Sequence, residues 1–426
     1  MRKFELGAEF AAKLDAADPL YAVRDRFYLN EGEIYMDGNS LGLCSKDAEE
    51  ATLRALEAWK TNGINIWNME DGKYFLYPSY IGGLLAGLIG ADKDEVTVTN
   101  STTINIHQAV ATFYHPTETR YKILVDDLNF PTDIHAVVSQ VALKGLDPAE
   151  AVKVVKSPDG RMIDEDAVIA AMTDDVALCL LPSVLYRSAQ LLNMEKVSAA
   201  ARERGVIIGW DLCHSIGAVP HNFKQIDADF AVWCNYKYVN GGPGAVGGLY
   251  VNRRHFGKVP GMAGWHGNDK STQFQLSHTH TPSNDVDGWL TGTPPILSMA
   301  GTEGMINIFN DVGLAKVREK SLNITAYLMY LIDERLTQYG YSVGNPREDE
   351  IRGGHVALEH AEAYRICQAL KSYRVIPDYR EPNVVRLAPV ALYVSYAEVH
   401  RLVDILEEIA RDKIYEKFSM ERTGVF

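Results

Sequence analysis

The sequence predicts an α/β fold, with a mostly parallel sheet in a large domain and a smaller α+β domain. Through the middle of the chain, short apolar runs rich in β-branched residues alternate with helical patterns. Several of these runs are apolar almost throughout, as expected of parallel strands covered on both faces. After about residue 308 the pattern changes to longer amphipathic helices with isolated strands between them.

The expected elements follow in chain order. In the large domain we expect a helical pattern over 193–205 and strands over 95–100, 121–127, 176–183, 205–211, 229–235 and 247–253. In the small domain we expect helices over 317–336, 361–371 and 397–412, with strands over 353–360 and near 384–390. We expect residues 1–50 to join the small domain, 51–308 to form the large domain and 309–426 to complete the small one.

Composition excludes several classes of function. The chain has 426 residues and a net charge of −14, and it lacks the basic, aromatic-rich cluster of a nucleic-acid-binding protein. It also lacks a secretory signal pattern and any apolar run of about 18 residues, so we expect a cytoplasmic protein without membrane contact. Its five cysteines form no CxxC pair, which argues against a metal site or a disulfide framework.

Two strand ends carry residues typical of a pyridoxal phosphate site. Ligands gather at the carboxyl ends of parallel strands. Asp211 closes the strand over 205–211, and Lys237 follows the strand over 229–235. A lysine can form a Schiff base with this cofactor, while a carboxylate pairs with its protonated pyridine nitrogen. The alternative for Asp211 is an ordinary loop cap.

Two further strand ends favour the same cofactor. Ser101, Thr102 and Thr103 open a helix whose free amides suit a phosphate, although they also suit a plain cap. Phe130 and Asp133 follow the strand over 121–127, where a ring can stack on a flat cofactor and a carboxylate can contact it. A plain turn is the alternative there. Four such strand ends are hard to explain separately, so we expect a pyridoxal phosphate enzyme.

The chain resembles kynureninases, within the class V branch of fold-type I pyridoxal phosphate enzymes. The resemblance covers nearly the whole chain and rests on residues 35–42 (YMDGNSLG), 96–105, 129–133, 210–220, 236–244, 264–265, 291–298 and 378–393 (DYREPNVVRLAPVALY). It implies the fold-type I architecture, with a mostly parallel seven-stranded sheet in the large domain. It also implies a homodimer with shared active sites.

The resemblance assigns roles residue by residue. Lys237 matches the Schiff-base lysine, Asp211 the partner of the pyridine nitrogen, and His214 a residue near the ring. Positions that hold or surround the phosphate are matched by Ser101, Thr102, Tyr236, Trp265 and Thr293, of which Trp265 and Thr293 would come from the partner subunit. Phe130 matches the stacking residue, Asp133 a neighbouring cofactor contact, and Arg386 the arginine that binds the substrate α-carboxylate. Ser40 and Trp67 are candidates for the aryl pocket.

The implied reaction is hydrolysis of L-kynurenine, or its 3-hydroxy form, to anthranilate (or 3-hydroxyanthranilate) and L-alanine, in tryptophan catabolism. The Cβ–Cγ bond breaks. Lys237 would move the α-proton, Asp211 would keep the cofactor an electron sink, and Tyr236 is the candidate for proton transfer or oxyanion stabilisation. Tyr236 could instead serve only the phosphate.

Departures from the family pattern concern substrate choice. His266 and Asn268 replace a phenylalanine and a histidine, Cys213 replaces an alanine, and Pro182 and Ala189 lie in an altered segment. None of them touches the lysine and aspartate pair.

Alternative functions stay open at this level. A cysteine desulfurase needs a cysteine on an exposed loop after the lysine, whereas Cys367 lies in a helical pattern where we expect burial. An aminotransferase, an epimerase, or a lyase or hydrolase for another γ-keto amino acid would share the cofactor residues. A non-catalytic regulator should have lost Lys237 or Asp211, and both are present.

Overall fold

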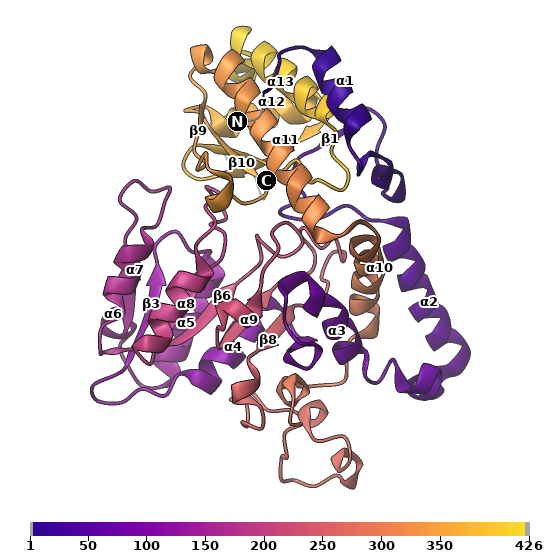
Figure 1. Ribbon diagram of the computed structural model, residues 1–426, viewed down its shortest axis with the longest axis vertical. Coiled ribbons are helices and arrows are strands. Elements are labelled where there is room, and N and C mark those ends of the chain that lie inside the picture. The colour runs from indigo at the N-terminus through magenta and orange to yellow at the C-terminus, as the bar shows by residue number, and fades with distance from the viewer. Residues whose placement is uncertain (1–2, 422–426) are drawn as a thin grey trace.

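The computed structural model describes residues 3–421 and contains a seven-stranded sheet in its larger part (Figure 1). The strand order is β2-β8-β7-β6-β5-β3-β4, and β8 alone runs antiparallel to its neighbours. The strands are β2 (Val96–Val98), β3 (Lys122–Asp126), β4 (Val152–Val155), β5 (Val176–Pro182), β6 (Ile207–Asp211), β7 (Phe230–Trp233) and β8 (Gly248–Val251). The mostly parallel α/β sheet predicted from the sequence is confirmed.

Strand β4 is not among the strands predicted from the sequence. It lies at the edge of the sheet, pairs only with β3, and is mostly half-buried or exposed. Its Val-Lys-Val-Val sequence therefore lacks the long apolar run that marks the central strands.

Helices cover both faces of this sheet. The side chains of the central strands alternate between two buried clusters, one on each face of the sheet. In β5, Leu178 and Leu180 belong to one cluster, whereas Cys179 and Leu181 belong to the other. The first cluster contains residues of α4 (Thr102–Phe113) and α5 (Pro131–Leu143), and the second contains residues of α3 (Tyr77–Ile89) and α8 (Met194–Glu203). The shorter helices here are α6 (Pro148–Ala151), α7 (Glu165–Ala171) and α9 (Phe223–Ile226).

The smaller part of the molecule is built on an antiparallel sheet with the order β12-β13-β10-β9. Its strands are β9 (Ser342–Val343), β10 (Val356–Glu359), β12 (Asp378–Arg380) and β13 (Val384–Leu387), and its helices are α11 (Leu314–Arg335), α12 (Ala363–Ser372) and α13 (Tyr396–Arg411). The expected helices and strands after residue 308 are thus confirmed, with shifts of a few residues at their ends.

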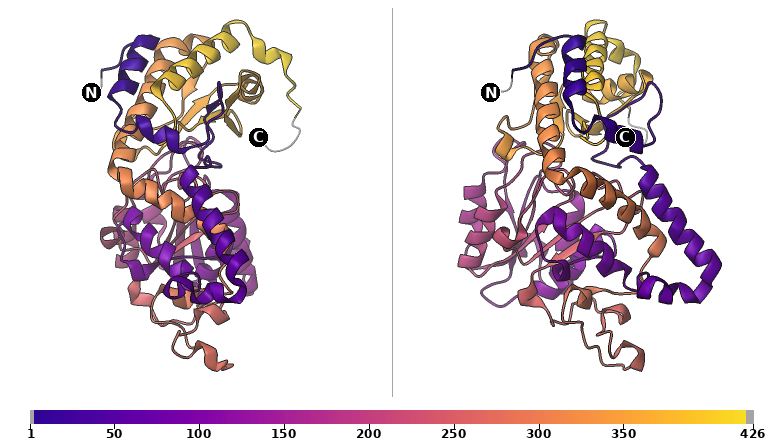
Figure 2. Two further views of the ribbon diagram at one scale, coloured as in Figure 1. Left: turned by 90° about the vertical axis from the view of Figure 1, so that its right-hand side faces the viewer. Right: turned by 45° about the vertical axis from the view of Figure 1, so that its right-hand side comes forward.

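The N-terminal segment lies against this smaller part. Helix α1 (Ala8–Ala17) packs beside α13, and β1 (Ile34–Tyr35) pairs in parallel with β11 (Val375–Ile376), as Figure 2 shows for α1. The boundaries at residues 50 and 308 stay a prediction. Helix α10 (Ile296–Val312) packs along α2 (Lys46–Asn62) at the side of the larger part.

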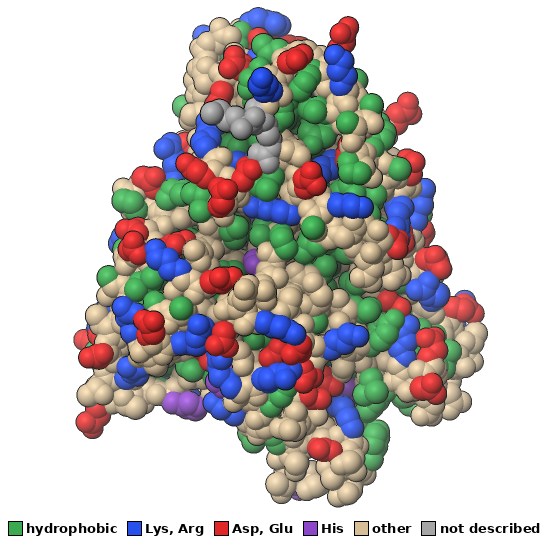
Figure 3. Space-filling model, in the orientation of Figure 1, with side chains coloured by type: hydrophobic (Ala, Val, Ile, Leu, Met, Phe, Trp, Pro, Cys, Tyr) green, Lys and Arg blue, Asp and Glu red, His purple; other side chains and the backbone are tan. Residues whose placement is uncertain are grey.

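Residues 256–295 form a lobe between β8 and α10 that extends from the bottom of the molecule in Figure 1. Over the described residues, no helix is both long and apolar enough to cross a membrane. Acidic and basic side chains are interspersed over the face drawn in Figure 3.

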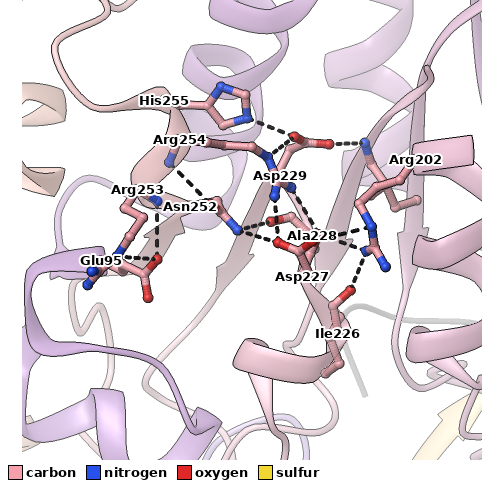
Figure 4. A network of polar contacts seen from close by, with 11 residues as sticks. Glu95, Arg202, Ile226, Asp227, Ala228, Asp229, Asn252, Arg253, Arg254 and His255 are labelled. Atoms are coloured by element: carbon pink, nitrogen blue, oxygen red, sulfur yellow. Dashed lines mark hydrogen bonds and ion pairs between the residues drawn. The ribbon is translucent and has the colours of Figure 1, made fainter.

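A polar network links neighbouring strands at the end of the sheet opposite Lys237, where the parallel strands begin (Figure 4). Asp229, just before β7, accepts hydrogen bonds from the Ile208 amide (2.8 Å), His255 (2.7 Å) and Arg254 (3.1 Å). Burial alone would raise the pKa of Asp229, but the hydrogen bonds from His255 and Ile208 hold this pKa below its usual value. The ionised carboxylate therefore stabilises the sheet.

We predict that Asp229→Asn lowers the free energy of unfolding by about 3 kcal/mol at neutral pH, because it leaves buried donors without their charged acceptor. Since the pKa of Asp229 is depressed in the fold, this stabilisation is present above the unfolded-state pKa of about 3.8 and is lost as the pH falls through the lower folded-state pKa. Urea unfolding between pH 7 and about pH 3.5 should show that the difference in free energy of unfolding between the wild type and Asp229→Asn becomes smaller as the pH falls. The exposed Asp166→Asn serves as the control, and an equal effect of both changes would contradict the account.

Candidate active site

Lys237 lies in a turn that directly follows β7. Its Nζ atom donates a hydrogen bond to His214 Nε2 at 2.9 Å and lies 5.8 Å from the ring centre of Phe130. Burial, followed by the charge of Lys237, lowers the pKa of His214 well below its usual value. His214 is therefore neutral at pH 7 and accepts the bond from the amine.

The N-terminal segment fixes the backbone of this turn. The Gly42 amide donates to the carbonyl of Tyr236 at 2.7 Å, and the Asn240 amide donates to the carbonyl of Lys237 at 2.8 Å. A β-carbon on Gly42 would lie 2.5 Å from the Lys237 carbonyl oxygen and 2.1 Å from Asn240 Oδ1. Only glycine fits at this contact, which explains a glycine in the GNSLG stretch.

Two buried carboxyl groups face the lysine. Asp211 ends β6 and accepts a hydrogen bond from the Cys213 amide at 2.8 Å. Both side-chain oxygens of Asp133, at the start of α5, are buried without a hydrogen-bond partner. Burial raises the pKa of each acid, and the Asp211 charge raises that of Asp133 further, whereas the charge of Lys237 opposes both shifts.

The start of helix α4 provides hydroxyl groups and amides next to these charges. Ser101 is its N-cap and accepts from the Ile104 amide, and Thr103 Oγ1 lies 3.3 Å from Thr132 Oγ1. An exposed helix start with free amides favours an anion such as a phosphate.

These elements surround one cavity of about 200 Å³. Nine of the residues selected from the sequence line it: Ser101, Thr102, Thr103, Phe130, Asp133, Asp211, His214, Tyr236 and Lys237. Sequence reasoning missed other lining residues, namely Asn100, Thr132, Cys234, Gly244, Ala245 and Gly247. Thr132 lies between Phe130 and Asp133 in a stretch already selected, so its neighbours were the available signal.

Pyridoxal phosphate fits this cavity by the chemistry of its lining. The unpartnered oxygens of Asp133 and the carboxylate of Asp211 are acceptors for a protonated ring nitrogen and for polar ring groups, and Lys237 is the amine within the same space. The α4 terminus and the Thr102 hydroxyl suit the phosphate.

Tyr236 stays protonated in this environment. The neighbouring Cys234 and burial raise its pKa. Its hydroxyl is therefore a hydrogen-bond or proton donor and not a base.

Arg386 lies beside the cavity, on β13 of the other sheet. Its side chain is only 1% exposed and donates to Ser40 Oγ at 2.7 Å and to the Tyr186 carbonyl at 2.9 Å. The Tyr186 ring is 5.3 Å from that of Phe130, which connects Arg386 to the lysine cavity. Arg386 Nε has no partner, so one buried donor is left for a ligand.

Asp378 holds the arginine from the neighbouring strand. It is paired with Arg386 in the antiparallel register of β12 and β13, and their side chains form a buried ion pair. Asp37 contributes a further carboxyl group nearby, whose pKa is raised to about 6 by burial and by Asp378. Sequence reasoning missed Asp378, although it opens the DYREP stretch.

Besides Ser40 and Arg386, three selected residues do not line the lysine cavity of the single chain. Trp67 and Thr293 lie in a second, more open cavity of about 410 Å³, together with Trp59. Trp265 lies in the lobe, where its ring is 5.6 Å from Phe274 and 6.4 Å from Phe75. The chain therefore carries an aromatic surface separate from the lysine.

The residues that depart from the family pattern lie in different environments. His266 is buried, and its ring packs 4.9 Å from Phe75, whose carbonyl lies 3.2 Å from His266 Nε2. Burial is the main cause that lowers the pKa of His266 to about 4, so this side chain is neutral. Pro182 ends β5 opposite Asp211, and Ala189 has a φ of 59°, a conformation that favours glycine. Asn268 lies on the lobe and donates to the Trp265 carbonyl.

Solved structures share this fold. An apo cysteine desulfurase from Thermococcus onnurineus NA1 superposes with a TM-score of 0.78 at 19% identity, covering 92% of this chain and 98% of that one. A variant of C-DES with glycine covalently linked to its PLP cofactor gives a TM-score of 0.77 at 16% identity, covering 90% and 99%. The fold and the site define the class: the architecture is that of fold-type I, class V pyridoxal phosphate enzymes.

Sequence relatives define the family. A kynureninase of Bacillus thuringiensis subsp. konkukian (strain 97-27) is 54% identical over 422 residues, which cover 99% of each chain. A kynureninase of Geobacillus thermodenitrificans (strain NG80-2) is 52% identical over 417 residues, covering 98% of this chain and 97% of the relative. The family model of the kynureninase C-terminal domain matches residues 317–406. The chain belongs to the kynureninase family.

We predict that Gly42→Ala disturbs the Lys237 turn, because the added methyl group collides with the Lys237 carbonyl and cannot be accommodated by a side-chain movement alone. The expected loss is about 1–3 kcal/mol in the free energy of unfolding, with reduced retention of the cofactor in dialysis. Gly87→Ala on the open face of α3, where a β-carbon meets nothing within 4 Å, is the matched control. It should be neutral or stabilising. Equal behaviour of the two variants would refute the close contact.

Proposed function

We propose that this chain hydrolyses L-kynurenine, or its 3-hydroxy form, to an anthranilate and L-alanine, with pyridoxal phosphate held covalently by Lys237. The observation that carries the proposal is the single cavity in which Lys237, Asp211 and the start of α4 meet, in a chain at least half identical to named kynureninases over nearly its full length. When bound, the cofactor supplies an electron sink for the carbanion formed at the substrate α-carbon.

The protein's own side chains supply binding and proton transfer. Arg386 binds the α-carboxylate through its unpartnered Nε, with Ser40 beside it. The Lys237 amine takes the proton from the α-carbon, and its hydrogen bond to the neutral His214 orients it. The carboxylate of Asp211 holds a proton on the ring nitrogen.

Tyr236 acts at the carbonyl end of the substrate. Because its pKa is raised, the hydroxyl donates a hydrogen bond to the oxygen of the γ-carbonyl group as water adds there. This stabilises the negative charge that develops on the oxygen before the Cβ–Cγ bond breaks.

Cysteine desulfurase activity finds no support in this chain. Cys367, the only cysteine after Lys237, lies on α12 with 1% of its surface exposed, and burial raises its pKa well above the usual value. It therefore neither lines the lysine cavity nor ionises readily.

The quaternary structure we propose is a homodimer with shared active sites, working in the cytoplasm. Trp265 and Thr293 lie outside the lysine cavity of their own chain, and Phe274 and Leu276 on the lobe expose 69% and 67% of their surface. Burying such a surface against a second copy is favourable. All five cysteines are free thiols, which suits a reducing compartment.

Lys237→Ala tests the proposed chemistry. We expect the variant to lose both the visible absorbance of covalently held cofactor and all release of anthranilate from L-kynurenine, while unfolding as the wild type does. Lys60→Ala, on the exposed face of α2, should retain both properties. Turnover by Lys237→Ala would disprove the role of the lysine.

Mixing two inactive variants tests the shared sites. We expect Lys237→Ala and Trp265→Ala homodimers to be separately impaired. A refolded equal mixture should regain up to about a quarter of the wild-type activity, because about half of its dimers are mixed and one of the two sites in each mixed dimer has both residues intact. Unfolding and refolding the two variants together, against each alone, provides the measurement. Absence of recovery in mixed dimers of verified composition would contradict a shared site.

A further inference from the structure

Two free thiols lie side by side at the floor of the lysine cavity. Cys213 follows β6 and Cys234 follows β7, and both line the cavity. Strands β6 and β7 are parallel neighbours, with Asp211 opposite Val232. Beyond this pair the Leu212 amide still donates to the Val232 carbonyl at 2.8 Å, so the turn that follows β6 begins beside Cys234.

The sulfur atom of Cys213 contacts the backbone of Cys234. The Cys234 amide donates a hydrogen bond to Cys213 Sγ at 3.2 Å, in place of the next rung of the strand ladder. Neighbouring strands are about 4.8 Å apart, which lies within the Cα–Cα range of roughly 4.4–6.8 Å found for disulfides. The backbone separation of neighbouring strands is therefore one that a disulfide can span.

The two thiols differ in acidity. Burial would raise the pKa of Cys234, but the hydrogen bond with the Cys213 thiol and the charge of Lys237 bring it below its usual value. For Cys213, burial and the Cys234 neighbour raise the pKa well above its usual value. Cys234 is therefore the more acidic of the two thiols and the one that more readily supplies a thiolate to attack an oxidant.

We propose that Cys213 and Cys234 form an oxidation site at which a peroxide converts the two thiols to a disulfide in the cofactor-free enzyme. The Cys234 thiolate attacks the peroxide O–O bond, and the resulting sulfenic acid is then attacked by the Cys213 sulfur. With hydrogen peroxide, two thiols and one peroxide give one disulfide and two molecules of water, so that sulfur is oxidised and peroxide oxygen is reduced.

Bound cofactor should protect the site, and this part rests on the proposed function. Both sulfur atoms line the same space as Lys237, and Cys213 Sγ also lies 3.7 Å from Thr102 Oγ1 at the start of α4. A cofactor in this cavity covers them, whereas a disulfide there withdraws Cys213 from Thr102 and reshapes the floor. Oxidation is thus expected to lower the capacity for cofactor binding until the disulfide is reduced.

The experiment compares the holoenzyme with enzyme freed of cofactor by hydroxylamine and dialysis. Both are treated with hydrogen peroxide, alkylated, digested and measured by mass spectrometry. We expect a linked pair of peptides containing Cys213 and Cys234, lighter by about 2 Da than their sum, in the cofactor-free sample. Dithiothreitol should remove the link and restore binding of added pyridoxal phosphate, read by visible absorbance.

Two variants keep the test specific. Cys213→Ala should fold and should leave Cys234 as an unlinked sulfenic acid, trapped by dimedone. Cys179→Ala changes a fully buried thiol that does not line the cavity, so it should behave as the wild type. Oxidation confined to the exposed Cys44, or no link in cofactor-free enzyme whose thiols are intact, would overturn the proposal.

Equal linking with and without cofactor would overturn the shielding and leave the oxidation chemistry standing. The proposed hydrolysis is measured separately, as product release by the reduced holoenzyme. A failure of one is therefore distinguishable from a failure of the other.

Discussion

The arrangement of charge at the carboxyl edge of the seven-stranded sheet is the constraint on which the rest of the structure depends. One lysine and two buried carboxyl groups, Asp211 and Asp133, share a small space, and the oxygens of Asp133 have no hydrogen-bond partner among residues 3–421. Buried carboxyl groups without partners are costly, and they are retained where a ligand completes them. The sheet supplies the positions, since parallel strands end together at one edge.

A second constraint comes from the other sheet, which carries Arg386, the residue proposed to bind the substrate carboxylate. Arg386 is fixed by Asp378 across two antiparallel strands and by Ser40 from the N-terminal segment. That same segment contacts the Lys237 turn through Gly42. Distant parts of the chain thus meet at one site. The geometry of this site depends on how the two sheets are held together.

Much of the fold and of the cofactor site could be predicted from the sequence, for physical reasons. Central strands are apolar on both faces, and strand ends are followed by the polar residues that parallel sheets bring together, which is why Lys237, Asp211, Ser101 and Phe130 could be selected. Strand β4 was not predicted because it is a short edge strand in which Lys153 interrupts the apolar run. Asp378 and Cys234 escaped because their partners are set by the register of neighbouring strands, which no local pattern encodes. Trp67, Trp265 and Thr293 were selected by resemblance alone and lie outside the single-chain cavity, so their place in the site depends on the proposed homodimer.

The most direct measurement of the central claim is the stoichiometry of products. Purified holoenzyme is incubated with L-kynurenine and, separately, with 3-hydroxy-L-kynurenine, while anthranilate or 3-hydroxyanthranilate and alanine are quantified together. The account predicts equal amounts of the aromatic acid and L-alanine from at least one of the two substrates. A change in the cofactor spectrum with no aromatic acid and no alanine from either substrate would contradict it, since Lys237 would then serve a different amino acid.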